Sequence, residues 1–275
     1  MRAKRISNLF ILAVLVVSSA IALFPIYMAV INSFKTQGEM FESFLSLPTS
    51  LHFENYSQAY DKLDLLHSAF NSVIVSVIGI GGIVFCASLA GYKLSRTRGK
   101  VSDLLFLLFV ASMLVPFHSI MIPLTRMAKD LHVQGTSYGL GVIYIGLGVN
   151  MAVFLYHGFV KSIPRELEES AEMDGCNQFQ AFFQIIFPLL LPITVTIAIL
   201  DFLWIWNDFL LPLLMLSDAN SYTLIISTNK LFGEYNKDWS LILAALVLTA
   251  IPVVLIYGFF QRFIMHGIAE GAVKG

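Results

Sequence analysis

The chain has 275 residues, of which 57% are hydrophobic and only 13% are charged. Soluble proteins average roughly 45–50% apolar and about 25% charged residues, so this composition excludes an ordinary water-soluble domain and indicates an integral membrane protein. The formal net charge of −1 provides no overall field that would recruit nucleic acid.

Apolar stretches long enough to cross a bilayer occur six times. A spanning helix needs about 20 mostly apolar residues. The predicted spans are Leu9–Ile31, Ser68–Tyr92, Leu104–Thr125, Ser137–Val160, Pro188–Leu216 and Trp239–Gln261. Only the fifth contains acidic residues, Asp201 and Asp208. We therefore predict an all-α integral membrane fold of six transmembrane helices, forming a single domain over residues 1–275.

Six spans place both termini on one side of the membrane, and the basic residues indicate which side. The segments on the side of the termini hold 11 lysines and arginines, and the alternate segments hold six. Because basic loops stay inside, we predict that both termini are cytoplasmic. The less favoured alternative for the N-terminus is a cleavable signal peptide, whose apolar core is usually shorter than this one.

The loop between the fourth and fifth predicted spans, residues 161–187, carries helix start and stop signals. Ser162 is a candidate N-cap, and Pro164 suits the first turn of the short helix that follows. Gly175 supplies a left-handed stop. The loop therefore predicts a short helix that ends at a glycine elbow.

A second short helix is predicted directly after the elbow. Asn177 is its candidate cap, with Gln180 three residues later as in a capping box. Large apolar side chains then recur at helical spacing, at Phe179, Phe182, Phe183 and Ile186.

The loop is also acidic, with two bases against five acids. Glu166, Glu169 and Glu172 are spaced to form one ridge on the first helix. An anionic membrane surface would repel such a loop. The residues leave two interpretations open. The helix pair either docks into a basic partner protein, or it is a solvated acidic hairpin whose phenylalanines lie on the inner ends of the spans.

The same loop resembles the E-A-A-x-x-x-G-(nine residues)-I-x-L-P loop of binding-protein-dependent ABC permeases. Five positions are in register with that pattern, namely Glu169, Ala171, Gly175, Ile185 and Pro188. Two positions depart from it, because Ser170 replaces an alanine and Phe187 replaces a leucine.

The resemblance covers nearly the whole chain and points to the carbohydrate-uptake subfamily, to subunits similar to the second permease of maltose-type importers. It is carried by Asn71-Ser72, Ala87 to Tyr92, Pro116, Ile122 to Leu124, Ile163-Pro164, Trp204 to Phe209 and Gly271 to Gly275. His118 stands where these permeases more often have a glutamine. The resemblance implies a type I ABC importer permease with a cytoplasmic coupling-helix loop.

For the coupling loop, this resemblance implies docking into a cleft on a cytoplasmic ATPase. The residues expected to make that contact are Glu169, Ser170, Ala171, Asp174 and Gly175. The cytoplasmic C-terminal tail, residues 262–275, is also expected to reach the ATPase pair, through Gly271, Lys274 and Gly275.

The expected partners are a second permease forming a heterodimer, two ATPase subunits or an ATPase dimer, an extracellular solute-binding protein and a sugar. We expect a bacterial or archaeal cell membrane as the location. The sequence lacks a Walker-type loop for binding the phosphates of ATP, because Gly99-Lys100 is followed by Val101 and has no upstream glycine at the required spacing. ATP and Mg²⁺ are therefore expected in the partner ATPase, while this chain has no predicted cofactor, metal site or catalytic residue.

Asp201, Trp204 and Asp208 follow helical spacing in the fifth span and are predicted to share one stripe. Acids within a membrane usually face a cavity or a partner. The stripe is either part of the translocation path, where carboxylates and an indole would bind a sugar, or a set of contacts to neighbouring helices. An alternative function is a proton-coupled carrier that uses Asp201 and Asp208, but it gives the acidic elbow no role.

Overall fold

In the computed structural model the chain is all-α and has no strand in the part described, which comprises the backbone of residues 2–233 and 238–272 and the side chains of 8–233 and 238–259. The predicted all-α fold is confirmed. The contacts between residues divide the chain into two compact units. The first comprises Met1–Leu65 with Ser227–Ile251, and the second Leu66–Ile226 with Pro252–Gly275.

The first unit contains the N-terminal helix and the segment that follows it. Its elements are α1 (Arg2–Ser33), α2 (Gln37–Glu42), α3 (Glu54–Leu63), most of α13 (Leu224–Lys230), the 3-10 turn η3 (Leu231–Gly233) and the first part of α14 (Trp239–Ala272). Every side chain of α1 from residue 8 to residue 27 is exposed, which is the state expected of a helix solvated by lipid.

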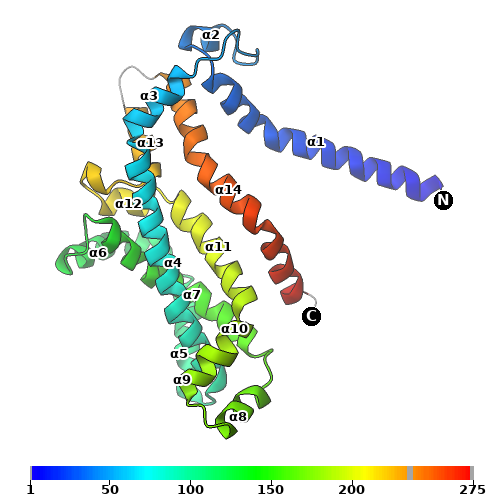
Figure 1. Cartoon of the computed structure of the whole chain (residues 1–275), viewed down its shortest axis with the longest axis vertical. Helices are drawn as coiled ribbons and strands as arrows, with labels where there is room; N and C mark the ends of the chain where they lie inside the picture. The colour runs from blue at the N-terminus through cyan, green and yellow to red at the C-terminus, as the bar shows by residue number, and fades with distance from the viewer. Residues whose placement is uncertain (1, 234–237, 273–275) are drawn as a thin grey trace. The chain divides into compact units, whose positions relative to one another are not determined.

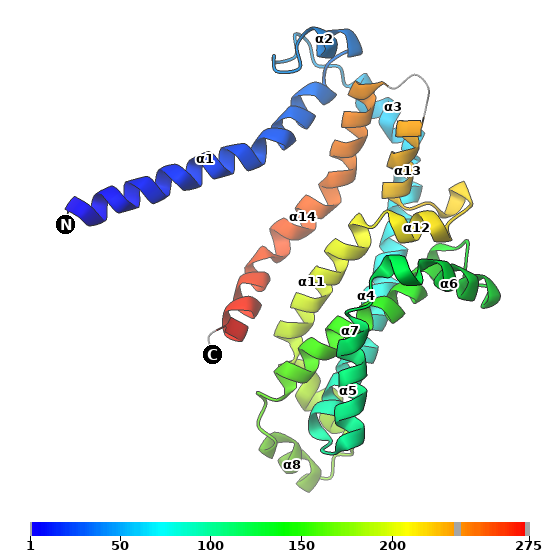
Figure 2. The same ribbon diagram turned by 180° about the vertical axis from the view of Figure 1, so that it is seen from behind.

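The second unit contains the larger helical core. Its elements are α4 (Leu65–Arg96), α5 (Lys100–Ser112), α6 (Phe117–Asp130), α7 (Ser137–Val160), α8 (Glu166–Met173), α9 (Gln178–Ala181), the π-helical turn η1 (Phe182–Ile186), α10 (Phe187–Leu189), α11 (Leu191–Asn207), α12 (Leu210–Met215) and the 3-10 turn η2 (Ala219–Ser221). The central helix is α7, which packs against α5 and α11. Both views place α8 at one end of the group formed by α4, α5 and α7 (Figures 1 and 2).

Small residues let α4 approach α7 closely. A Cβ atom at Gly91 would lie 2.7 Å from the Cβ of Tyr156 and 3.0 Å from the backbone nitrogen of His157. The Tyr156 side chain is fully buried at this crossing. A side chain at Gly91 would therefore push the two helices apart.

Among the residues that the structure describes, four helices are long and apolar enough to cross a membrane: α1 from Asn8, α4, α7 and α14 as far as Phe259. Two further pairs of helices, Lys100–Ser112 with Phe117–Asp130 and Gln178–Leu189 with Leu191–Asn207, reach the required length only when both helices of a pair are taken as one bent segment. If each pair is one span, the number of spans is six. The chain is thus a multi-pass membrane protein.

The third and fifth predicted spans are not continuous helices, which corrects the sequence prediction. The third bends by 102° between α5 and α6, and the fifth bends by 73° between α10 and α11. Proline explains both breaks because it cannot donate a hydrogen bond to the carbonyl four residues earlier. Pro116 follows the end of α5 at Ser112 by four residues, and Pro192 stands just after the bend at Leu190.

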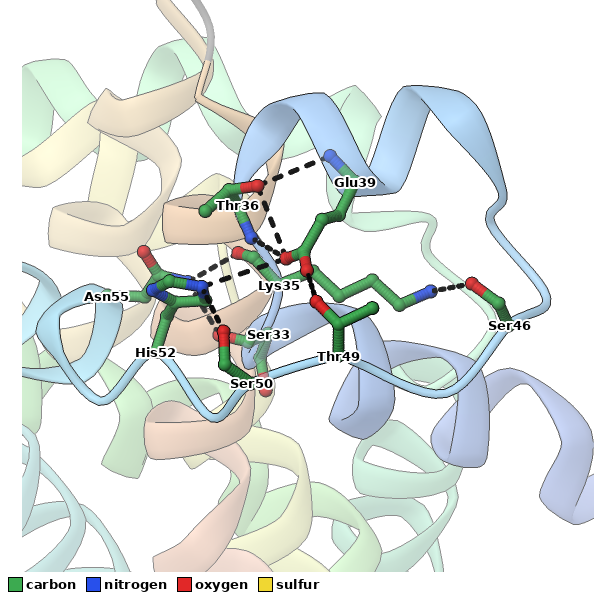
Figure 3. A network of polar contacts seen from close by, with 9 residues as sticks. All are labelled: Ser33, Lys35, Thr36, Glu39, Ser46, Thr49, Ser50, His52 and Asn55. Atoms are coloured by element: carbon green, nitrogen blue, oxygen red, sulfur yellow. Dashed lines mark hydrogen bonds and ion pairs between the residues drawn. The ribbon is translucent and has the colours of Figure 1, made fainter.

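A polar network ties the end of α1 to the loop and helices that follow (Figure 3). The Lys35 side chain is fully buried and donates to the Ser43 carbonyl at 2.9 Å. The Asn55 amide donates to the backbone oxygens of Ser33 and Lys35, at 2.8 Å each. Backbone groups of the loop are thereby satisfied without regular secondary structure.

Glu39 is the central acceptor of this network (Figure 3). It forms a capping box with Thr36, whose backbone N–H donates to the carboxylate at 2.9 Å. The Thr49 hydroxyl donates to the other carboxylate oxygen, and His52 lies 3.8 Å from the carboxylate. The hydrogen bonds from Thr49 and Thr36 hold the pKa of Glu39 below its usual 4.5.

This depressed pKa predicts a pH dependence of the loop. A carboxyl whose pKa is lower in the folded state stabilises the fold fully above its unfolded pKa of about 4.5, and that contribution is lost as the pH falls through the folded value. We expect protection factors in hydrogen exchange over residues 36–52 to fall only in that acid range. Glu39→Gln should remove the pH dependence and Glu42→Gln should keep it. Equal protection above and below the transition would contradict the assignment.

Candidate functional site

The segment between α7 and α11 folds as two short helices joined at a glycine, as predicted. The start of the first helix differs from the prediction. Ser162 does not cap it, because its hydroxyl turns back to donate to the Phe159 carbonyl in the last turn of α7, at 2.8 Å. Instead α8 begins at Glu166, after Arg165, without a side-chain cap. Three glutamates occupy its first turn, where the helix dipole favours negative charge.

The end of α8 confirms the predicted left-handed stop. Gly175 has φ +88°, a backbone conformation that favours glycine. The Cys176 N–H donates to the Ala171 carbonyl at 3.0 Å, and the Gly175 N–H donates to the Glu172 carbonyl at 3.1 Å. This pair of hydrogen bonds is a Schellman motif, which satisfies the last carbonyls of α8 and fixes the direction of the chain leaving it.

The second helix starts at the predicted capping box. The Gln180 N–H donates to the Asn177 side chain, and the Asn177 N–H donates to the Gln180 side chain, both at 2.9 Å. The helix then widens into the π-helical turn η1, and the predicted apolar stripe is split. Phe182 and Ile186 are fully buried, whereas Phe179 is 71% exposed. The split falls between α9, which carries Phe179, and the π-helical turn, which carries Phe182 and Ile186.

Several contacts attach the elbow to the end of α4, and two of them are made by one acidic side chain. Glu168 accepts a hydrogen bond from the Arg96 Nε at 2.6 Å and another from the Tyr92 hydroxyl at 2.8 Å. Arg96 also donates from a terminal nitrogen to the Ile163 carbonyl at 2.9 Å. The Tyr92 ring packs against Phe182 with centroids 5.0 Å apart. These contacts, hereafter the α4 clamp, join the elbow to a membrane-spanning helix.

The α4 clamp is shielded from solvent. The Arg96 and Glu168 side chains are only 12% and 14% exposed. A charge-assisted hydrogen bond in such surroundings is stronger than one on an open surface, where screening weakens ion pairs. The clamp therefore holds α8 in one orientation relative to α4.

The sequence did not single out the members of the clamp. Tyr92 and Arg96 are one helical turn apart at the end of the second predicted span, which places them on one face of α4. Glu168 lies outside the ridge of Glu166, Glu169 and Glu172. The position of Glu168 off this ridge is the sequence feature that could have suggested that its side chain faces inward.

The structure places the predicted coupling residues on the outer side of the elbow, with one exception. Glu169, Ser170, Asp174 and Gly175 are exposed, but Ala171 is 3% exposed and faces inward. Leu167 and Ser170, which lie beside Ala171 at helical spacing, are exposed. Two large apolar side chains join the exposed acids, because Met173 is 88% exposed and Phe179 is 71% exposed.

The predicted stripe on the fifth span is not formed. α11 ends at Asn207, and Asp208 has extended backbone with φ −71° and ψ 134°. Pro212, four residues later, cannot donate to the Asp208 carbonyl, which favours the break at this point. Asp208 thus leaves the helical face that carries Asp201 and Trp204.

The two acids of the fifth span lie in different surroundings. Asp208 accepts from the Tyr144 hydroxyl at 2.7 Å and from the Leu210 N–H at 3.0 Å. Asp201 is 8% exposed, and its Oδ2 has no hydrogen-bond partner among the described residues. Asp208 therefore joins α7 to the break before α12, while Asp201 presents an unsatisfied acceptor.

Trp204 is 41% exposed and contacts Tyr144 edge to face, with centroids 5.3 Å apart. Tyr144 thus contacts both Trp204 and Asp208, a connection that the sequence did not reveal. At the C-terminus, α14 continues to Ala272, so Gly271 lies in a helix. Lys274 and Gly275 lie outside the described residues.

A family model described as "Binding-protein-dependent transport system inner membrane component" matches residues 82–269. The chain belongs to this family. Its members are transport subunits, so the prediction of a transport subunit rather than an enzyme is confirmed.

Several relatives are similar over nearly their whole length. The chain is 41% identical to the probable starch degradation products transport system permease protein AmyC of Thermoanaerobacterium thermosulfurigenes, over 94% of each sequence. It is 34% identical to the melibiose/raffinose/stachyose import permease protein MelC of Bacillus subtilis, over the full length of both. It is 31% identical to the multiple sugar-binding transport system permease protein MsmG of Streptococcus mutans, over 98% of this chain and 99% of that protein.

A solved structure supports the fold. The crystal structure of a bacterial ABC transporter involved in the import of the acidic polysaccharide alginate contains a chain that matches with a TM-score of 0.85. The two chains are 22% identical, and the match covers 95% of this chain and 98% of that one. The fold is therefore that of an ABC importer permease.

The α4 clamp predicts a strong effect of Glu168→Gln. The substitution keeps the side-chain shape but removes the charge that Arg96 and Tyr92 bind, and a hydrogen bond to a charged group contributes about 1.5–3 kcal/mol. We expect faster hydrogen exchange at the amides of residues 166–173. The control is Glu172→Gln, which removes an exposed acid from the same helix. Equal exchange rates in the two variants would show that the clamp does not hold α8.

The left-handed stop predicts that Gly175→Ala destabilises the elbow through the backbone alone. No atom lies within 4 Å of a Cβ built at Gly175, so the cost of about 1–2 kcal/mol comes from its φ of +88°. We expect a lower melting temperature of the purified assembly. Gly146→Ala, in α7, is the matched control, because its Cβ also meets open space and its backbone is helical. A similar loss in both variants would contradict the explanation.

Proposed function

We propose that this chain is a permease subunit of an ATP-driven, binding-protein-dependent sugar importer, in which it forms half of the translocation path. The observation that carries the proposal is the full-length similarity to permeases named for starch degradation products, for melibiose, raffinose and stachyose, and for multiple sugars. In this assembly the chain pairs with a second permease in the cell membrane, and an extracellular solute-binding protein delivers the sugar.

The elbow of α8 and α9 is the proposed contact to a separate ATPase on the cytoplasmic side. A coupling element must pass on motion rather than absorb it, and it therefore has to be rigid. The Schellman motif at Gly175, the capping box at Asn177 and the α4 clamp supply that rigidity. Closure of the ATPase would then move α4 together with the elbow.

The exposed side of the elbow has the chemistry of a docking surface. Glu169 and Asp174 supply negative charge, and Met173 and Phe179 supply apolar area. Protein interfaces typically combine an apolar centre with a charged rim of complementary sign. The partner surface on the ATPase is therefore expected to be an apolar cleft with basic residues at its edge. The C-terminal residues Gly271, Lys274 and Gly275 are proposed to reach the same partner.

Asp201 and Trp204 are the proposed contribution of this chain to the translocation path. A buried carboxylate oxygen without a partner is costly inside a membrane. A sugar hydroxyl can donate to this oxygen, and an indole can pack against a pyranose ring. Asp208 is proposed to hold α7 against the end of α11, because both of its oxygens already accept hydrogen bonds.

The proton-coupled carrier finds no support among the relatives, which are permeases of ABC-type systems. The two acids that it would use as a relay are also unlike each other. Asp208 is hydrogen-bonded to Tyr144, whereas Asp201 has an oxygen without a described partner.

Glu169→Lys tests the proposed coupling. The substitution reverses an exposed charge on the proposed docking surface, so we expect normal membrane insertion but loss of co-purification with the ATPase and loss of ATP-driven sugar uptake. The measurement is uptake by proteoliposomes that contain the intact assembly, with the sugar identified from the ligand held by the purified solute-binding protein.

Glu42→Lys is the matched control, since it reverses an exposed charge at the end of α2, away from the elbow in the sequence, and should leave co-purification with the ATPase unchanged. Normal co-purification and normal uptake in Glu169→Lys would contradict docking at the elbow. Sugar uptake that persists without any ATPase, and stops when the proton gradient is dissipated, would overturn the proposed function itself.

A further inference from the structure

A polar cavity of about 370 Å³ lies beside the elbow, where the end of α4 turns into α5. It is enclosed by the segment 94–99, by Asp103 in the first turn of α5, by His157 and Lys161 at the end of α7, and by Arg165 in front of α8. All of these elements belong to the second unit. Apart from Arg96 of the α4 clamp, the residues that line this cavity have no part in the proposed coupling and translocation roles.

The cavity is strongly basic. Four cationic side chains line it, Arg96, Arg98, Lys161 and Arg165, against the single carboxylate of Asp103. Arg96 is balanced by Glu168 of the α4 clamp, which leaves the other three bases facing one acid. Like charges gathered around one cavity repel each other, and a bound anion would relieve that repulsion.

The donors that face this cavity are largely unused. The Arg98 and Lys161 side chains make no hydrogen bond or ion pair with another described residue. The Arg165 side chain makes one hydrogen bond, from a terminal nitrogen to the Arg96 carbonyl at 3.2 Å. Ser95 is another residue that lines the cavity, and its hydroxyl oxygen is buried behind the cavity wall without a hydrogen-bond partner among the described residues. An unpaired buried hydroxyl is unusual and indicates a missing partner.

The backbone adds positive potential at the same place. α5 begins after Gly99, which lines the cavity, and no side chain caps its first turn. The nearby Ser102 hydroxyl donates to the Leu94 carbonyl and does not cap the helix. The N-terminus of a helix attracts anions through its free N–H groups and its dipole. Asp103 offsets part of this potential without cancelling it.

We propose that this cavity binds a phosphate group. Guanidinium groups match the oxygens of phosphate through paired hydrogen bonds, and lysine adds a point charge. Two sources share this chemistry, the headgroup of an anionic phospholipid and a free phosphate compound. We favour the lipid, because the cavity lies at the ends of α4 and α7, two helices long and apolar enough to cross a membrane, and headgroups lie at the ends of such spans.

The position of the site gives it a consequence for the elbow. Arg96 lines the cavity and binds Glu168 of α8, and Arg165 lines the cavity and directly precedes α8. A bound phosphate would add hydrogen bonds to the residues that already hold the elbow in place. Occupancy of the site therefore stabilises the attachment of α8 to α4.

The test measures lipid binding to the full-length chain in its intact assembly, in nanodiscs of phosphatidylcholine that contain increasing amounts of phosphatidylglycerol. The variant is the double substitution Arg98→Gln and Lys161→Gln, which removes exposed bases without touching the α4 clamp. Each base near an anionic headgroup is worth about 1 kcal/mol, so we expect binding of phosphatidylglycerol to weaken roughly 10- to 30-fold.

The matched control is Arg126→Gln with Lys129→Gln, which removes one exposed arginine and one exposed lysine from α6, outside the cavity. Lys100→Gln is a second control, because Lys100 is adjacent in sequence but does not line the cavity. Both controls should retain the affinity of the unmodified assembly. A loss in either control equal to that of the double variant would overturn the proposal, because it would reveal a general effect of charge.

A second arm titrates inorganic phosphate into the same assembly in detergent, with sulfate as a comparison. Binding of phosphatidylglycerol without binding of inorganic phosphate would support the proposal and assign the lipid as the source. Binding of inorganic phosphate that the double variant loses would support it with a free phosphate compound as the source. Failure to bind either probe, or unchanged binding in the double variant, would overturn it. Neither arm uses transport as a readout, so the result is independent of the proposed function.

Discussion

The orientation of the elbow depends on one carboxylate at the end of a membrane-spanning helix. Glu168 draws the Arg96 guanidinium and the Tyr92 hydroxyl to the same point, in a place largely closed to water. The hydrogen bonds that shape α8 and α9 internally are local and would survive without it. The link from Glu168 to Arg96 and Tyr92 joins α8 to α4 through a charged side chain, so that in the proposed coupling the elbow would move together with this helix.

This link also organises the chemistry around it. Because Glu168 is engaged inward, the acids that remain exposed on α8 are free to face a partner. Arg96 is neutralised by the same contact, while Arg98, Lys161 and Arg165 keep the neighbouring cavity positive. The ion pair between Arg96 and Glu168 therefore lies between an acidic surface on the elbow and a basic cavity beside it.

The sequence predicted the features that depend on neighbouring residues. The stop at Gly175 and the capping box of Asn177 and Gln180 are set within six residues, and both are present. Hydropathy also identified the apolar spans, but it does not report bends, so the breaks near Pro116 and Pro192 appeared only in the structure. Contacts such as Arg96 with Glu168 join residues 72 positions apart, and no local pattern encodes them.

The π-helical turn at Phe182–Ile186 allows the number of residues at this point to change without rotating the helix that follows. In an α-helix each residue turns the chain by about 100°, so an added or lost residue would swing everything downstream to a new face. A turn with hydrogen bonds from i to i+5 holds one extra residue as a bulge and leaves the flanking helices in phase. The junction between the elbow and the fifth span can therefore accommodate one inserted or deleted residue. The orientation of the elbow relative to that span would be retained.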